Sequence, residues 1–138
     1  MLLANKVHTT NYFNTFIAVA PDTVAKASQT PPNSIKCSVA RKEWEILSKN
    51  PYTYTGDDIA FMTRGMGFEW DEFFARGQAC FRTSALCKRY GYGIHFDNDG
   101  KIALIPMESE AYKLFLNDAN IKQTQSMRNK KNNWLYGR

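Results

Sequence analysis

The stretch Lys88–Pro106, KRYGYGIHFDNDGKIALIP, decides the fold of this chain. Two segments of apolar, β-branched and aromatic residues flank Asp97–Gly100, whose residue types are typical of turns. This pattern predicts a β-hairpin. A hairpin in turn determines which side chains share a face, because side chains alternate along each strand.

The predicted hairpin has one aromatic face and one face with little side-chain volume. The aromatic face holds Tyr90, Tyr92, Ile94 and Phe96. The other face holds Gly91, Gly93 and His95. Glycine in a strand leaves space that a packed helix or a ligand must fill, and of the two we expect a helix.

The length of the turn sets the register of this hairpin. We expect a two-residue turn, either Asn98-Asp99 or Asp99-Gly100. In both cases Ile94 would share its face with Ala103, and His95 would share its face with Leu104.

The rest of the chain predicts an α+β fold: a small, mostly antiparallel sheet with a hairpin in the C-terminal half and about three helices packed on it. A further strand is expected at Tyr12–Ala20, and helices at Ser38–Lys49, Glu69–Arg76 and Glu108–Leu116. Cys80–Thr83 is expected to be extended and Ser84–Lys88 to form a turn of helix. Ile59–Thr63 alternates like a strand, although it could equally begin a helix capped by Thr55; we predict a strand.

Composition and length favour one domain, which we place at residues 1–121, followed by a basic tail at 122–138 that could pack on it. No segment approaches the ~20 apolar residues that span a bilayer, and the first residues do not resemble a signal peptide. The three cysteines form no Cys-x-x-Cys pair, which favours a reducing, cytoplasmic location and no metal site. We expect no cofactor.

The net charge of +5 comes from the C-terminal tail. Residues 122–138 contain five basic residues and no acid, whereas the other residues balance. This distribution argues against a basic surface on the folded body. The tail could contact nucleic acid through Arg128, Lys130 and Lys131, although a solvated tail explains the same residues.

Hydroxyl, basic and imidazole groups suggest a binding site for a small anion. Arginine, hydroxyls and the start of a short helix can hold a phosphate or carboxylate. The candidate ligand-binding residues are His8, Arg82, Ser84, Lys88, Arg89 and His95. A solvated basic edge is the simpler explanation, because no glycine-rich phosphate loop is present.

A catalytic site is the competing interpretation. Cys80 could act as a nucleophile with His95 or His8 as its base, provided that the sulfur and an imidazole lie within hydrogen-bond reach. No third orienting residue can be named, so a small buried cysteine is the simpler interpretation of Cys80. His95 is likewise interpreted first as a core histidine.

Several blocks, taken in order, resemble a family of small bacterial proteins known only as a domain of unknown function. The blocks are HTTNYFNTFI at 8–17, NPYTYTGDD at 50–58, FFARGQAC at 73–80, KRYGYGIH at 88–95 and MRNKK at 127–131. The resemblance implies a bacterial cytoplasmic domain, and it carries no catalytic residue to this chain.

Together these observations predict a binding or interaction module without catalytic activity. Its partner would be a small anion or a protein, and a homodimer through exposed aromatic residues is a further possibility. The alternatives are a cysteine enzyme and a protein that associates with nucleic acid through the tail.

Overall fold

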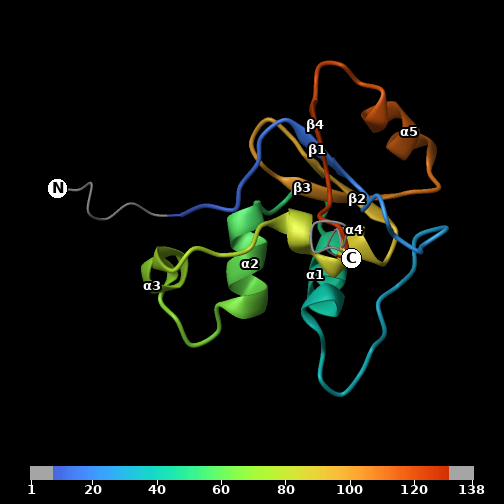
Figure 1. Cartoon of the computed structure of the whole chain (residues 1–138). Coiled ribbons are helices and arrows are strands. Elements are labelled where there is room, and N and C mark those ends of the chain that lie inside the picture. Colours follow the sequence, from blue (N-terminus) through green and yellow to red (C-terminus); the bar gives the residue numbers. More distant parts are fainter. Residues whose placement is uncertain (1–7, 131–138) are drawn as a thin grey trace, which may run out of the picture.

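The computed structural model describes residues 8–130 and is built on one four-stranded sheet (Figure 1). The strands are β1 (Thr15–Ala18), β2 (Tyr92–Phe96), β3 (Ile102–Pro106) and β4 (Lys122–Gln125), in the spatial order β3-β2-β1-β4. β2 runs antiparallel to both β1 and β3, whereas β4 runs parallel to β1. The predicted α+β class and mostly antiparallel sheet are confirmed.

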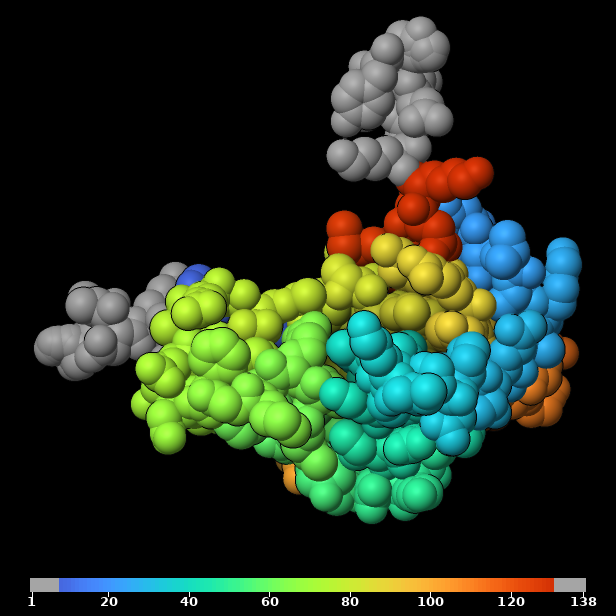
Figure 2. Space-filling model, turned by 90° about the horizontal axis from the view of Figure 1, so that it is seen from below, coloured from blue at the N-terminus to red at the C-terminus, as the bar shows by residue number. Residues whose placement is uncertain are grey.

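Helices cover both faces of the sheet. They are α1 (Val39–Lys49), α2 (Gly56–Arg64), α3 (Trp70–Ala75), α4 (Ala85–Lys88) and α5 (Glu110–Leu116), with a 3-10 turn η2 (Phe81–Thr83) before α4. α1, α2 and α4 lie on one side and α5 on the other; seen from the first side, little of α5 is visible (Figures 1 and 2). Residues 8–130 therefore hold five α-helices rather than about three, and none of them combines the length and apolarity needed to cross a bilayer.

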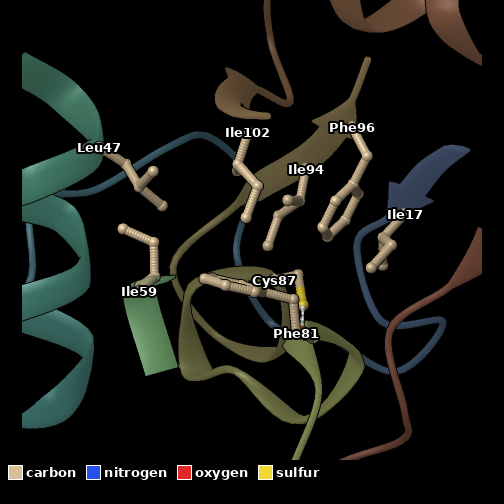
Figure 3. Packing of buried hydrophobic residues seen from close by; sticks show 8 residues of the cluster. All are labelled: Ile17, Leu47, Ile59, Phe81, Cys87, Ile94, Phe96 and Ile102. Carbon is tan, nitrogen blue, oxygen red and sulfur yellow. Dashed lines mark hydrogen bonds between the residues drawn. The ribbon is translucent and has the colours of Figure 1, made fainter. Parts of the chain in front are cut away.

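The largest apolar cluster lies between the sheet and the first helical layer. Figure 3 shows side chains from β1, β2, β3, α1, α2, η2 and α4 pointing toward a common centre. The fully buried members include Ile17, Leu47, Ile59, Ile94 and Ile102. Burial of such side chains contributes about 1.5–3 kcal/mol each, so this cluster is the main source of stability for the layer.

Two segments that we predicted to be extended are helical. Residues 59–63 belong to α2, because Thr55 and Asp58 form a capping box in which each side chain accepts a hydrogen bond from the other residue's amide. The alternative helix capped by Thr55 is therefore the correct one. Residues 81–83 form η2, in which the Thr83 amide donates a hydrogen bond to the Cys80 carbonyl at 3.1 Å.

The predicted hairpin is present, but its register differs by one residue from the expected one. Asp97 pairs with Lys101, which leaves a three-residue turn in which Gly100 has φ +79°. The Asp97 side chain accepts hydrogen bonds from the Asp99 and Lys101 amides and so stabilises this longer turn.

This shift moves every residue of β3 to the other face. Ile94 lies opposite Leu104 and His95 lies opposite Ala103, the reverse of the expected arrangement. The alternation within β2 is as predicted, and Tyr92, Ile94 and Phe96 are buried on the side of α1 and α4. The aromatic face of the hairpin is thus part of the core and is not a contact surface.

The first part of the basic segment 122–138 lies in the sheet. Lys122–Gln125 forms β4, which pairs with β1 from Thr15 to Ala18. The boundary that we placed before Lys122 therefore falls at the start of a strand of the sheet. The weak periodicity of this segment hides the strand, because three of its four residues are exposed and none is apolar.

A helix fills the space that Gly93 leaves in β2, as expected. Phe16 of β1 and Tyr112 of α5 meet above this glycine with ring centroids 5.2 Å apart. A β-carbon at position 93 would lie 2.6 Å from Phe16 and 2.7 Å from Tyr112. The absence of a side chain at this position therefore lets α5 approach the sheet.

Replacement of Gly93 by alanine should lower the free energy of unfolding by about 1–3 kcal/mol, since the added methyl group forces Tyr112 and Phe16 apart. Urea denaturation followed by circular dichroism measures this change. An unfolding midpoint equal to that of the unmodified chain would contradict the close packing of α5 on β2.

Candidate functional site

Two adjoining hollows of about 570 Å³ and 340 Å³ form a groove beside η2 and α4. Both hollows are lined by Asn129 and Lys130. The basic side chains around them are Arg82, Lys88, Arg89, Arg128 and Lys130. We call this surface the basic groove, and its five basic residues make it electropositive at neutral pH.

The parallel pairing of β4 with β1 brings the basic residues of the tail to this groove. After β4, the Ser126 amide donates a hydrogen bond to the Ala18 carbonyl, and the Met127 amide donates one to the Arg82 carbonyl, both at 2.8 Å. Arg82 Nε in turn donates to the Gln125 carbonyl at 2.7 Å. Figure 2 shows the red residues near 126–130 lying against the yellow segment that contains η2 and α4.

Asp22 holds the tail at the far end of the groove. Its carboxylate accepts hydrogen bonds from the Asn129 amide at 2.9 Å and the Lys130 amide at 3.1 Å. Asn129 also donates through Nδ2 to the Lys88 carbonyl at 2.9 Å. The hydrogen bonds from the Asn129 and Lys130 amides lower the pKa of the Asp22 carboxyl, so the carboxylate stays charged at neutral pH.

The groove unites two sets of residues that the sequence presented separately. Arg82, Lys88 and Arg89 come from the predicted anion site, whereas Arg128 and Lys130 come from the predicted nucleic-acid set. Lys131, the third member of that second set, lies outside the described residues, as does the rest of the tail. Sequence reasoning missed Asp22, which lies just after the predicted strand Tyr12–Ala20 and was assigned no functional role.

Two other predicted ligand residues lie elsewhere. Ser84 is buried and caps α4 by accepting from the Leu86 amide, while its hydroxyl donates to Glu43 at 2.8 Å. It faces a separate cavity between α1 and α2. His8 is exposed, and its ring lies beside Gly77 at the end of α3.

His95 lies on the opposite face of the sheet, under α5. Its Nδ1 is hydrogen-bonded to the Tyr52 hydroxyl at 2.7 Å, and its ring stacks on Phe115 with centroids 4.1 Å apart. Partial burial lowers the pKa of His95 and favours the neutral ring. These contacts are those of a packed histidine that supports the α5 layer.

The structure does not bring Cys80 and His95 together. Cys80 Sγ lies 3.1 Å from the Tyr12 hydroxyl, and the Tyr12 ring packs on Phe96 in the helical layer opposite α5. Burial, together with the Cys80 contact, raises the pKa of Tyr12 to about 12, so the phenol is a poor base at neutral pH. Cys80 therefore has the Tyr12 hydroxyl, and not the imidazole of His95, as its neighbour.

Burial makes the Cys87 thiol a poor nucleophile at neutral pH. Cys87 is buried, and burial raises its pKa to about 12. Residues 8–130 contain no group of three or more histidine, cysteine, aspartate or glutamate side chains placed to hold a metal ion.

Comparison with known proteins adds a family but no activity. The model of a family described as "Family of unknown function (DUF6157)" matches residues 7–132, and the chain therefore belongs to that family. The expected resemblance to a family of unknown function is confirmed at this level. No curated protein and no solved structure matches the chain.

The pH dependence of Asp22 provides a test of how the tail is held. We call the hydrogen bonds from the Asn129 and Lys130 amides to Asp22 the clamp. Because the pKa of the Asp22 carboxyl is lowered in the folded protein, the clamp is complete above the ordinary aspartate pKa of about 3.9, and it is lost as the pH falls through the lowered pKa. The amide proton shifts of Asn129 and Lys130 should titrate together at that lower pH in ¹H–¹⁵N spectra.

Asp22→Asn should abolish this titration, whereas Asp99→Asn in the hairpin turn should leave it unchanged. Asn129 and Lys130 amides that titrate normally in the Asp22→Asn variant would contradict the clamp.

Proposed function

We propose that this member of the family of unknown function is a binding module that takes a small anion with more than one phosphate-like group in the basic groove. The observation that carries the proposal is the convergence of five basic side chains from two distant segments on one concave surface. Cations that converge in a hollow attract and orient a multiply charged anion more strongly than the same cations spread over a surface.

The charge balance of the groove supports an anionic ligand. Among the described lining residues the single acid is Asp22, and its oxygens already accept hydrogen bonds from Asn129 and Lys130. Its negative charge is therefore directed at the tail backbone. The charged groups around the ligand would then be guanidinium and ammonium groups, apart from Asp22.

Most of these cationic groups retain donors for a ligand. Arg82 uses Nε–H on the Gln125 carbonyl, and its terminal nitrogens make no hydrogen bond to residues 8–130. Within the same described range, the side chains of Arg89 and Arg128 make no hydrogen bond either. Arginine presents several N–H donors in a fork that matches phosphate oxygens, which favours phosphate over a singly charged carboxylate.

The two alternative functions that the sequence suggested, a nucleic-acid binder and a cysteine enzyme, are not equally supported. Nucleic acid remains the second candidate, because the same cations neutralise backbone phosphates. A cysteine enzyme receives no support from the geometry, so we propose a module without catalytic activity. Free thiols at Cys37, Cys80 and Cys87 are compatible with the reducing, cytoplasmic location that this proposal assumes.

Binding of pyrophosphate to the full chain, measured by isothermal titration calorimetry at low salt, tests the proposal. We expect saturable binding that weakens as salt is added, because exposed charges are screened. The double variant R89Q/R128Q should bind about tenfold more weakly, which corresponds to a loss of about 1.4 kcal/mol.

The matched control is K49Q/K113Q, which removes the same charge from α1 and α5, away from the groove. Equal weakening in both double variants would show a non-specific charge effect and would overturn the site. Binding of a 12-nucleotide single strand without any binding of pyrophosphate would replace the small anion with the nucleic-acid alternative.

A further inference from the structure

The two hollows of the basic groove differ in the chemistry of their walls. The larger hollow has the greater share of polar atoms, and Arg82, Gln125 and Arg128 are among its lining residues. Carbon atoms form most of the wall of the smaller hollow, although three of its six lining residues are basic. Long basic side chains produce such a wall when their hydrocarbon stems lie along a surface and their charged ends reach water. The smaller hollow is therefore better matched to the carbon part of a ligand than to its charged part.

Asp22 and Asn129, the two residues of the smaller hollow that are neither basic nor aliphatic, are already hydrogen-bonded within the chain. The Asp22 carboxylate accepts from the amides of Asn129 and Lys130. Asn129 Nδ2 donates to the Lys88 carbonyl at 2.9 Å. Val24, the sixth lining residue of this hollow together with Arg89, is aliphatic and 85% exposed. It leaves apolar surface in water, and a ligand that covers this surface gains free energy.

The two hollows lie close enough for one small molecule to occupy both. The tail passes them in turn: the Met127 amide donates to the Arg82 carbonyl at 2.8 Å, and Asn129 Nδ2 donates to the carbonyl of Lys88. Met127 and Asn129 are two residues apart, which is a distance of at most about 7 Å along the chain. Asn129 and Lys130 line both hollows. A ligand can therefore place a charged end in the larger hollow and an organic group in the smaller one.

We propose that the ligand of the basic groove is an ester of a diphosphate, with its phosphates beside Arg82 and Arg128 and its organic group in the smaller hollow against Val24. This assignment rests on the proposed function, because it names the ligand class of the same site. Inorganic pyrophosphate leaves the carbon-rich wall in water, whereas the organic group of an ester covers it. Nucleoside diphosphates and alkyl diphosphates share this chemistry.

Calorimetric titration of the full chain with three esters at pH 7 and low salt tests this assignment. Methyl diphosphate has the same charged group as ADP and dimethylallyl diphosphate, but its organic group is a single carbon. We expect ADP or dimethylallyl diphosphate to bind about fivefold more tightly than methyl diphosphate, because covering hydrocarbon adds to the same charge interactions. A gain with ADP alone identifies a nucleotide, and a gain with dimethylallyl diphosphate alone identifies an alkyl diphosphate. No gain with either would overturn the assignment.

Inorganic pyrophosphate separates this assignment from the proposed function. Binding of pyrophosphate and methyl diphosphate, without tighter binding of either larger ester, would overturn the ester assignment alone and leave the anion site in place. Absence of binding by pyrophosphate and by all three esters would overturn the proposed function, and the ester assignment with it.

Two surface variants locate the organic group. Val24→Ser should reduce the preference for the larger ester over methyl diphosphate by about threefold, because it removes two methyl groups from the smaller hollow. Ile35→Ser is the matched control, since Ile35 is also aliphatic and highly exposed but lines neither hollow. Its preference should equal that of the unmodified chain. An unchanged preference in Val24→Ser, or an equal reduction in both variants, would overturn the placement.

The methyl resonances of Val24 provide a readout that needs no variant. In ¹H–¹³C spectra of the full chain, saturation with the larger ester should shift these resonances more than saturation with methyl diphosphate does. The methyl resonances of Ile35 should stay in place with both esters. Equal shifts of the Val24 resonances with the two esters would contradict an organic group in the smaller hollow.

Discussion

The pairing of β1 with a neighbour on each side is the constraint on which the rest of the structure depends. β1 has only four residues, all of them buried, yet it joins β2 of the hairpin to β4 of the tail. Its alternate side chains serve the two layers: Ile17 enters the cluster under α1 and α2, and Phe16 packs with Tyr112 of α5. The segments that meet at β1 are far apart in sequence, so this strand holds the two ends of the domain together.

The basic groove is a direct consequence of that pairing. Since β4 runs parallel to β1, the chain leaves the sheet beside Ala18 and passes Arg82 before it reaches Asp22. Backbone hydrogen bonds determine the path, and the basic side chains follow from it. The electropositive surface therefore belongs to the folded domain, although nearly half of its charges come from a segment that resembles a solvated tail.

The segment 79–89 separates the basic groove from the cavity beside α1 and α2 and contributes to both. Ser84 and Cys80 line the cavity beside α1 and α2, whereas Arg82, Lys88 and Arg89 line the groove. The 3-10 turn η2 makes this division possible, because successive side chains around the turn point in several directions. In an extended strand they would alternate strictly between two faces. This is why a compact set of donors in the sequence is divided in the structure.

The candidate site was only partly predictable. The basic residues of the groove were all named, but as two unrelated sets, because no local pattern shows that β4 joins the sheet. Glu43, the buried partner of Ser84, was not named at all. An acid on an amphipathic helix looks like a surface residue, and its burial depends on how α1 packs against the neighbouring helices.

The sequence alone determined the local structure wherever short-range chemistry is decisive. Ser38 caps α1, Glu69–Arg76 contains α3, and the turn residues before Lys101 reverse the chain. Tertiary structure decided the register of that reversal, the place of β4 and the convergence of the groove, whereas the helical state of residues 59–63 follows from the local Thr55–Asp58 capping box. The physical reason is that a one-residue change of register or an exposed edge strand costs little locally, so burial of the whole sheet between two helical layers selects among the alternatives.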